Sequence, residues 1–335
     1  MTHLPLHARL PLHGGDLAAA QARWGRPAEG WLDLSTGINP WPYPLPELPP
    51  ECWRRLPDSA AHQSLLEAAA RRWAVPPHAR VVAGSGSQAL IQALPRITPP
   101  ADAAILGPTY GEHARAWAAA GHRVREIGRL DEAGDATVVV AVNPNNPDGR
   151  IIAPGQLLDL AARLAARGGL LVVDEAFCDE RPDLSLTAAT RPGLVVLRSF
   201  GKFFGLAGLR LGFAVAAEEM ADRLAAHLGP WPVSGPALGI GAAALADEAW
   251  SAATIARLSD AAARLDAILG GAGLEVAGGT FLFRLARHDH AAELYERLGR
   301  AGILVRAFAF RSDILRIGLL GDAAAERRLG TALGG

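Results

Sequence analysis

Short apolar runs alternate with alanine- and leucine-rich stretches between residues 81 and 228. The runs are mostly continuous, which is typical of strands buried on both faces of a parallel sheet. The stretches between them are typical of helices that cover such a sheet. We therefore predict an α/β fold with a mostly parallel central sheet flanked by helices. The strands are expected at 81–83, 103–106, 123–127, 137–142, 170–173, 194–198 and 211–215, and the helices at 88–94, 112–120, 154–167 and 218–228.

The flanking regions predict further parts. Residues 40–50 hold six prolines, which favour an extended segment because proline fixes φ and lacks an amide donor. Besides helices at 59–74 and 237–270, the pattern predicts a strand at 280–285, a helix at 290–300, and strands at 303–308 and 313–317. We expect an arm at 1–30 that joins the small domain, a large domain at 31–231 and a small α+β domain at 232–335, with a hinge at 231–236.

Composition excludes several function classes. The chain has 335 residues and a formal net charge of −1, which argues against binding to nucleic acid or to an anionic membrane. No uncharged apolar run is long enough for a membrane helix, and the N-terminus lacks a secretory signal pattern. The two cysteines, Cys52 and Cys178, are too few for a disulfide framework or a four-cysteine zinc site. We expect reduced thiols and a cytoplasmic protein.

The lysine content points to chemistry. Of 33 basic residues, 32 are arginines and only Lys202 is a lysine. A GC-rich genome explains the arginines but not why one lysine remains. Arginine stays protonated, whereas Schiff-base chemistry needs a neutral amine. Lys202 follows a predicted strand, and Phe200, Phe203 and Phe204 beside it predict a dry surrounding.

Three other polar segments follow predicted strands, at the sheet edge where ligands bind in α/β folds. Gly84–Gln88 opens a helix and could hold a phosphate on its free amides, although an ordinary tight turn is the alternative. It matches neither a Walker loop nor the dinucleotide fingerprint, since Ala89 stands in the last glycine position. Asn143–Gly149 favours a turn. Asp174 has no histidine close in sequence, so we expect no metal site there.

Taken in order, these segments resemble the fold-type I PLP enzymes of the class I/II aminotransferase family. The resemblance rests on Asn-Pro-Asn-Asn-Pro-Asp-Gly, Asp-Glu-Ala-Phe and Ser-Phe-Gly-Lys with a downstream arginine. It implies that Lys202 carries pyridoxal 5'-phosphate, that Asp174 pairs with the pyridine nitrogen, and that both are catalytic. The remaining cofactor contacts that it implies come from Gly86, Ser87, Gln88, Ser199 and Arg210 around the phosphate, and from Tyr110, Asn146 and Phe177 around the ring.

Two features, a residue that differs from the family pattern and a motif in the N-terminal arm, indicate which reaction to expect. Phe177 stands where many members of this family have a tyrosine, which changes the surroundings of the ring. His13-Gly14-Gly15-Asp16 and the segment Asp33–Pro40 resemble the threonine-phosphate decarboxylases of cobalamin biosynthesis. This resemblance implies that L-threonine O-3-phosphate loses CO2 to give (R)-1-amino-2-propanol O-2-phosphate.

The predicted substrate contacts lie near both ends of the chain. Arg316 resembles the arginine that binds the substrate carboxylate in this family, and Arg306 resembles one that binds a substrate phosphate; a solvated arginine is the alternative for each. By the same resemblance, His13, Gly14, Asn39 and Asn146 complete the substrate site, and the protein is a homodimer with its active site at the subunit interface.

Three rival functions are weighed. Histidinol-phosphate aminotransferase shares the expected fold, cofactor and phosphorylated substrate, but Phe177 and the His-Gly-Gly arm count against it. A PLP-binding regulatory module usually carries a DNA-binding segment, and residues 1–30 lack a helix-turn-helix pattern. A NAD-binding dehydrogenase is disfavoured because this sequence lacks the third glycine of the dinucleotide fingerprint. That function also gives no role to Lys202.

Overall fold

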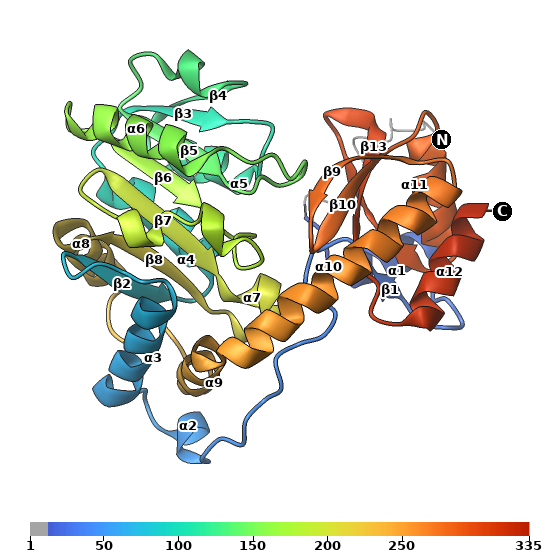
Figure 1. Ribbon diagram of the computed structural model, residues 1–335, viewed down its shortest axis with the longest axis horizontal. Coiled ribbons are helices and arrows are strands. Elements are labelled where there is room, and N and C mark those ends of the chain that lie inside the picture. The colour runs from blue at the N-terminus through green and yellow to red at the C-terminus, as the bar shows by residue number, and fades with distance from the viewer. Residues whose placement is uncertain (1–12, 335) are drawn as a thin grey trace. The chain divides into compact units, whose positions relative to one another are not determined.

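The computed structural model describes residues 13–334, so predictions for residues 1–12 lie outside the described residues. The chain forms two compact units (Figure 1). The large unit contains residues 42–146 and 150–252, and the small unit contains the chain up to Trp41, residues 147–149 and residues from 253 onward. Among the described residues, no helix is both long enough and apolar enough to cross a membrane.

The large unit is built on a seven-stranded sheet of order β2-β8-β7-β6-β5-β3-β4. Every pair in it is parallel except those made by β8, which runs antiparallel to both of its neighbours. The predicted α/β class and all seven expected strands of this region are confirmed. The strands are β2 (Ala79–Gly84), β3 (Asp102–Leu106), β4 (Arg123–Ile127), β5 (Val138–Val142), β6 (Leu170–Asp174), β7 (Leu194–Ser199) and β8 (Gly212–Ala217).

Helices cover both faces of this sheet (Figure 1). Buried residues of α4, α5 and α8 pack with β-strand valines and leucines in one apolar cluster, while α6 packs on β6. Two short 3-10 helices, Pro182–Leu184 and Thr187–Ala189, follow β6, and the prolines before α3 lie outside helices and strands. The helices are α2 (Glu51–Arg54), α3 (Ser59–Arg72), α4 (Ser87–Ile97), α5 (Glu112–Ala119), α6 (Pro154–Ala165), α7 (Phe200–Phe203), α8 (Glu218–Leu228) and α9 (Gly235–Ala246).

The helix predicted over 237–270 is two helices, α9 and α10 (Glu248–Gly271). They separate at Asp247, whose backbone leaves the helical region with φ −87° and ψ 84°. Its carboxylate accepts a hydrogen bond from the amide of Trp250 at 2.9 Å, so Asp247 acts as the N-cap residue of α10. The alanine-rich pattern is continuous across this point, so periodicity alone did not reveal the break.

Asp247→Ala is expected to lower the free energy of unfolding by about 1 kcal/mol, because the variant loses this cap. Chemical denaturation of both proteins measures the difference. Asp260→Ala makes the same change at an exposed position inside α10 and should leave stability unchanged or slightly higher. Equal losses in the two variants would contradict the capping role of Asp247.

The large unit extends beyond the expected hinge at 231–236 and ends at Ala252. The reason is that α9 packs closely along α3, so the chain after the hinge still belongs to the core of the large unit. At the other end, the division falls after Trp41 rather than after residue 30, because β1 (Leu32–Asp33) pairs in parallel with β11 (Ile303–Leu304).

The small unit contains a four-stranded antiparallel sheet of order β12-β13-β10-β9. The single strand predicted at 280–285 was wrong: a turn at Phe281 and Leu282 separates β9 from β10. Gly278 and Gly279 lie inside β9 and weaken its sequence signal. The strand predicted at 303–308 is divided between β11 and β12, and α12 was not predicted. The elements are α1 (Leu17–Trp24), β9 (Glu275–Thr280), β10 (Phe283–Arg287), α11 (Ala291–Arg300), β12 (Arg306–Phe308), β13 (Arg311–Gly318) and α12 (Ala323–Gly334).

Candidate active site

The segment Gly84–Gln88 forms a tight turn between β2 and α4 in the large unit. Gly86 has φ +80°, and a Cβ atom there would lie 2.6 Å from Nη2 of Arg210. Gly212 is equally crowded, since its Cβ would lie 2.1 Å from the amide nitrogen of Ser87. The structure therefore brings Gly86, Ser87 and the Arg210 guanidinium together, and it leaves space only for glycine between them.

Sheet register adds Ser199 to this group. Gly212 of β8 pairs with Gly84 of β2 on one side and with Ser199 of β7 on the other. The exposed Arg210 adopts a left-handed conformation and donates a hydrogen bond to the carbonyl oxygen of Ala207 at 3.1 Å. Backbone amides at the start of the eleven-residue helix α4, a hydroxyl and a guanidinium are the groups that bind a phosphate dianion.

Asp174 ends β6 and is 3% exposed. One carboxylate oxygen lies 2.9 Å from Nε2 of His113 on α5, and the other accepts a hydrogen bond from the amide of Ala176. No histidine lies close to Asp174 in the sequence, but the fold supplies His113 from 61 residues away. A buried carboxylate held in this way can bind a protonated ring nitrogen.

The asparagines of the 143–149 segment have different roles. Asn143 bonds through its side chain to both backbone groups of Ile152, and it is buried. Asn145 is also buried; its side chain accepts a hydrogen bond from Thr109 and donates one to the carbonyl oxygen of Pro108. These two residues build the turn, whereas Asn146 is partly exposed at its tip.

Tyr110 lies between the Gly84–Gln88 turn and Asp174. Its hydroxyl donates to Oε1 of Gln88 at 3.1 Å, and the amide of Gln88 donates to Glu112. Burial, together with the carboxylates of Glu112 and Asp174, raises the pKa of Tyr110 to about 12. Tyr110 is therefore a neutral aromatic ring at physiological pH, and Gln88 fixes its orientation.

Lys202 lies in the short helix α7, directly after β7. Its Nζ is 5.5 Å from the centre of the Phe177 ring, and Phe177 is buried. Phe200, Phe203 and Phe204 are each no more than 2% exposed, while Lys202 itself is partly exposed. The structure thus joins Lys202 to Phe177 across the ends of β6 and β7.

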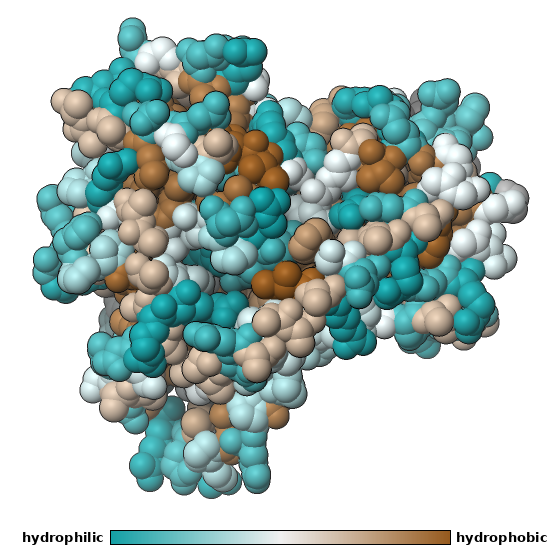
Figure 2. Space-filling view, viewed as in Figure 1, coloured by the Kyte–Doolittle hydropathy of each residue, from teal (hydrophilic) through white to brown (hydrophobic). Residues whose placement is uncertain are grey.

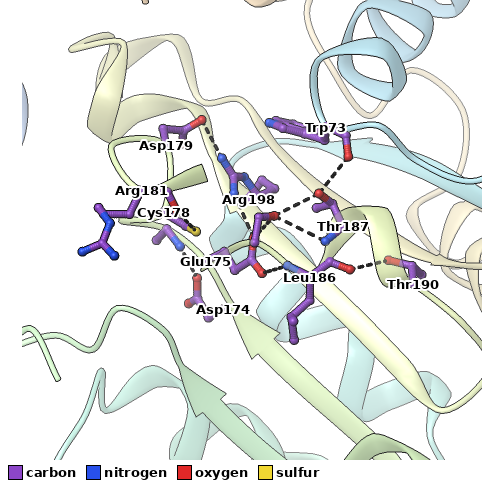
Figure 3. Close-up of polar contacts among 12 residues, drawn as sticks. Trp73, Asp174, Glu175, Cys178, Asp179, Arg181, Leu186, Thr187, Thr190 and Arg198 are labelled. Atoms are coloured by element: carbon purple, nitrogen blue, oxygen red, sulfur yellow. Dashed lines mark hydrogen bonds and ion pairs between the residues drawn. The ribbon is translucent and has the colours of Figure 1, made fainter. Parts of the chain in front are cut away.

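A network of buried charges, which sequence reasoning missed, lies beside these residues (Figure 3). Arg198 binds Glu175 at 2.9 Å through Nη1 and Asp179 at 2.6 Å through Nη2. Burial raises the pKa of Glu175 although Arg198 opposes the shift. Burial alone would lower the pKa of Arg198, but Asp179 and Glu175 hold it above its ordinary value.

The small unit gathers several of the predicted substrate residues. Arg306 of β12 and Arg316 of β13 are direct cross-strand partners. Arg316 donates a hydrogen bond to the carbonyl oxygen of Ser35, and Ser35 Oγ accepts one from the amide of Gly15. A Cβ atom at Gly14 would lie 2.4 Å from the Ser35 oxygen, so the arm requires glycine where it packs on this turn.

Burial lowers the pKa of both arginines. Arg316 is 6% exposed, and burial, with Arg306 beside it, lowers its pKa to about 10, which still leaves it charged at neutral pH. Burial also lowers the pKa of Arg306. Two cations side by side repel each other, so this pair favours a ligand with negative charge. Arg316 is therefore not a solvated arginine, whereas Arg306 is partly exposed and its role stays a prediction.

The two remaining predicted residues lie in the same unit. Asn39 is 2% exposed, and its side-chain oxygen accepts a hydrogen bond from the amide of Trp41 at 2.9 Å. This is the local turn that precedes Pro40 and Trp41. His13 is exposed at the first described position.

The geometry of the large unit suits one kind of cofactor. Such a molecule carries a phosphate for the Gly86–Arg210 cradle, a ring nitrogen for Asp174 and a carbonyl that condenses with an amine. The crowding at Gly86 and Gly212 means that this cradle is already built, since a side chain at either position would displace it. Pyridoxal phosphate has all three groups, and the residues present fit it.

Comparison with known proteins agrees with this geometry. The family model described as "Aminotransferase class I and II" matches residues 50–332. The chain belongs to this family. Two threonine-phosphate decarboxylases of the family are similar over nearly the whole chain: that of Sinorhizobium sp is 49% identical, covering 96% of this chain and 97% of its own, and that of Pseudomonas aeruginosa is 47% identical, covering 96% of each.

The family fold is also seen in a solved structure, that of histidinol-phosphate aminotransferase from Sinorhizobium meliloti in complex with pyridoxal-5'-phosphate. It superposes with a TM-score of 0.80 at 21% identity, covering 100% of this chain and 97% of that one. At this identity the likeness establishes the shared fold. It confirms the predicted fold class, a family fold with a mostly parallel sheet flanked by helices.

Proposed function

We propose that this protein decarboxylates L-threonine O-3-phosphate to (R)-1-amino-2-propanol O-2-phosphate with pyridoxal phosphate as cofactor. The observation that carries the proposal is the cross-strand pair of Arg306, which is partly exposed, and Arg316, which is buried; two adjacent cations suit a substrate with two anionic groups. The two decarboxylases that share nearly half of their residues with this chain support it. The expected cobalamin-pathway role of the product rests on the same resemblance.

The cofactor contacts follow from the large unit. When bound, pyridoxal phosphate supplies a ring that withdraws electrons from the substrate Cα after the carboxylate leaves. Lys202 would hold the cofactor through its amine, and Asp174 would pair with the protonated ring nitrogen. His113 keeps Asp174 in place through the 2.9 Å contact. Gly86, Ser87, Ser199 and Arg210 bind the phosphate, while Tyr110, Phe177 and Asn146 contact the ring.

The substrate contacts come from the small unit and the Asn146 turn. Arg316 would bind and orient the substrate carboxylate, the group that leaves as CO2, and the resemblance gives Asn146 the same role. Arg306, Asn39 and His13 bind the phosphate, and Gly14 admits the arm close to Ser35. Lys202 would donate a proton from its protonated amine to Cα, in place of the carboxylate lost as CO2, so that the amino group stays with the product.

The main alternative is transamination of the histidinol-phosphate type, which shares the fold. Phe177 disfavours it, since no hydroxyl faces the ring from this position.

The proposal also includes a homodimer with an interfacial active site, supported by the exposed Leu45, Trp53, Leu56 and Trp231. Figure 2 shows that hydrophilic residues dominate the visible face and that apolar residues gather in separate patches. A cytoplasmic location agrees with the two free cysteines.

Phe177→Tyr is expected to raise the fraction of turnovers in which the amino group is transferred to the cofactor, because it places a hydroxyl beside the ring and Lys202. The measurement is the amount of aminated cofactor formed per CO2 released. Phe177→Leu has no hydroxyl and should keep the wild-type ratio. An unchanged ratio in Phe177→Tyr would remove this role from Phe177.

The first test of the proposal is CO2 release from L-threonine O-3-phosphate by PLP-loaded protein without a keto acid. We expect CO2 over many turnovers, with aminopropanol phosphate as the remaining amine. No CO2, with activity only on histidinol phosphate plus a keto acid, would overturn the decarboxylase assignment in favour of transamination.

A further inference from the structure

A contribution to folding stability does not explain why the buried ion pairs of Arg198 lie where they do. Arg198, Glu175 and Asp179 have side chains that are no more than 4% exposed. Removing charges from water is costly, and apolar side chains of similar volume often give an equally stable core. Yet two of these residues are direct chain neighbours of proposed cofactor contacts: Glu175 follows Asp174, and Arg198 precedes Ser199.

The ion pair closes across two adjacent parallel strands at the point where both end. Asp174 of β6 pairs with Leu197 of β7, and the amide of Glu175 donates to the carbonyl oxygen of Leu197 at 2.9 Å. Successive side chains of a strand point to opposite faces. Asp174 therefore contacts His113 on one face. Glu175 contacts Arg198 on the other; Figure 3 shows this second contact.

The same network fixes the loop that follows β6. Glu175 accepts hydrogen bonds from the hydroxyl of Ser185 at 2.6 Å and from the amide of Leu186 at 2.7 Å. Asp179 belongs to this loop and binds the other arm of the Arg198 guanidinium. Phe177 lies between Glu175 and Asp179, so both ends of its short segment are attached to Arg198.

Only arginine suits this place. Its planar guanidinium presents several donors in a fixed fork, so it can bind two carboxylates on different arms. The ammonium of lysine is a single point charge on a flexible stem. The Arg198 guanidinium thus holds the segment that contains Asp174 and Phe177 against the end of β7. The segment of Ser199 and Lys202 continues directly from Arg198.

We propose that Arg198 is a positioning residue for the cofactor: through Glu175 and Asp179 it fixes Asp174 and Phe177 relative to Ser199 and Lys202. The inference rests on the proposed function, because it assigns the role with respect to pyridoxal phosphate. Arg198 itself touches neither cofactor nor substrate; it acts through the residues on either side of the two strand ends.

The test compares Arg198→Lys with Leu164→Ala in holoenzyme. Leu164 is fully buried on α6, which packs on β6, and its truncation lowers stability without touching the network. We measure thermal unfolding, the dissociation constant of pyridoxal phosphate, and the visible absorbance and circular dichroism of the bound cofactor. Arg198→Lys should weaken cofactor binding by about tenfold or more, change the dichroism band and lower kcat more than it raises KM. Leu164→Ala should lower only the unfolding temperature.

Wild-type cofactor affinity and dichroism in Arg198→Lys would overturn the inference. If that variant does not fold, Asp179→Asn serves instead, because it keeps the Glu175 pair; it should change the dichroism in the same direction by less, and an unchanged band would equally overturn the inference. A wild-type protein whose reduced cofactor is not on Lys202 would contradict the proposed function and this inference together. A normal wild-type chromophore that the Arg198 and Asp179 variants leave unaltered would contradict the positioning role alone.

Discussion

Replacing Lys202 with alanine is expected to abolish covalent attachment of pyridoxal phosphate and to lower kcat by about 10³-fold or more. The substitution removes the amine that we propose as both the cofactor attachment point and the proton donor to Cα, and proton transfer by a positioned side chain alone contributes about 10²–10⁴-fold. Borohydride reduction followed by peptide mass mapping measures attachment, and CO2 release measures turnover.

The sequence makes this experiment unusually clear. Lys202 is the only lysine, so no other side chain can carry a reduced pyridoxyl group in the variant. Lys202→Arg is the matched variant: it keeps the positive charge and the chain length but offers no neutral amine. It should lose attachment as completely as Lys202→Ala. A pyridoxyl label elsewhere in the wild-type protein, or full turnover by either variant, would contradict the assignment.

The second large effect is expected at the arginine pair. A hydrogen bond to a charged group contributes about 1.5–3 kcal/mol, so Arg316→Ala and Arg306→Ala should each lower kcat/KM by about 10–100-fold. The two variants should differ in the ligand that they penalise. Arg316→Ala should lose the preference for L-threonine O-3-phosphate over aminopropanol phosphate, which lacks the carboxylate. Arg306→Ala should lose the preference for L-threonine O-3-phosphate over L-threonine.

Inhibition and binding constants for these three ligands measure the two preferences. Arg311→Ala is the control on the strand of Arg316, because Arg311 is exposed and forms an ion pair with Asp313 at the surface. It should leave all three constants unchanged. Equal losses for every ligand in both Arg306→Ala and Arg316→Ala would show that the arginines support the fold of the small unit rather than bind different anions.

The strands of the large unit could be predicted because each is a short, continuous apolar run between turn residues. β4 and α8 begin and end where the sequence predicts them. The prediction failed where tertiary context decides the outcome. The alanine-rich pattern over 237–270 continues through Asp247, and only its hydrogen bond to the Trp250 amide shows that one helix ends and another begins. In β9, glycines hide a strand that pairing with β10 stabilises.

The candidate site divides in the same way. Its motifs are local, so the sequence alone predicted roles for Lys202, Asp174 and the Gly86 turn, and it showed that no second lysine competes with Lys202. It also determined the fold class, because hydrophobic periodicity is a property of neighbouring residues. His113 and the Arg198 fork could not be found in this way, since each acts on a residue far along the chain.

Only the tertiary structure decided that Arg306 and Arg316 are cross-strand partners, that Ser35 joins Arg316 to the Gly14–Gly15 arm, and that Arg198 ties the ends of β6 and β7 together. Strand register and helix packing bring these groups within contact distance, and burial then sets their charges. Sequence determines which chemistry the residues can perform; the distances and the dielectric surroundings that allow it arise only when the sheets form.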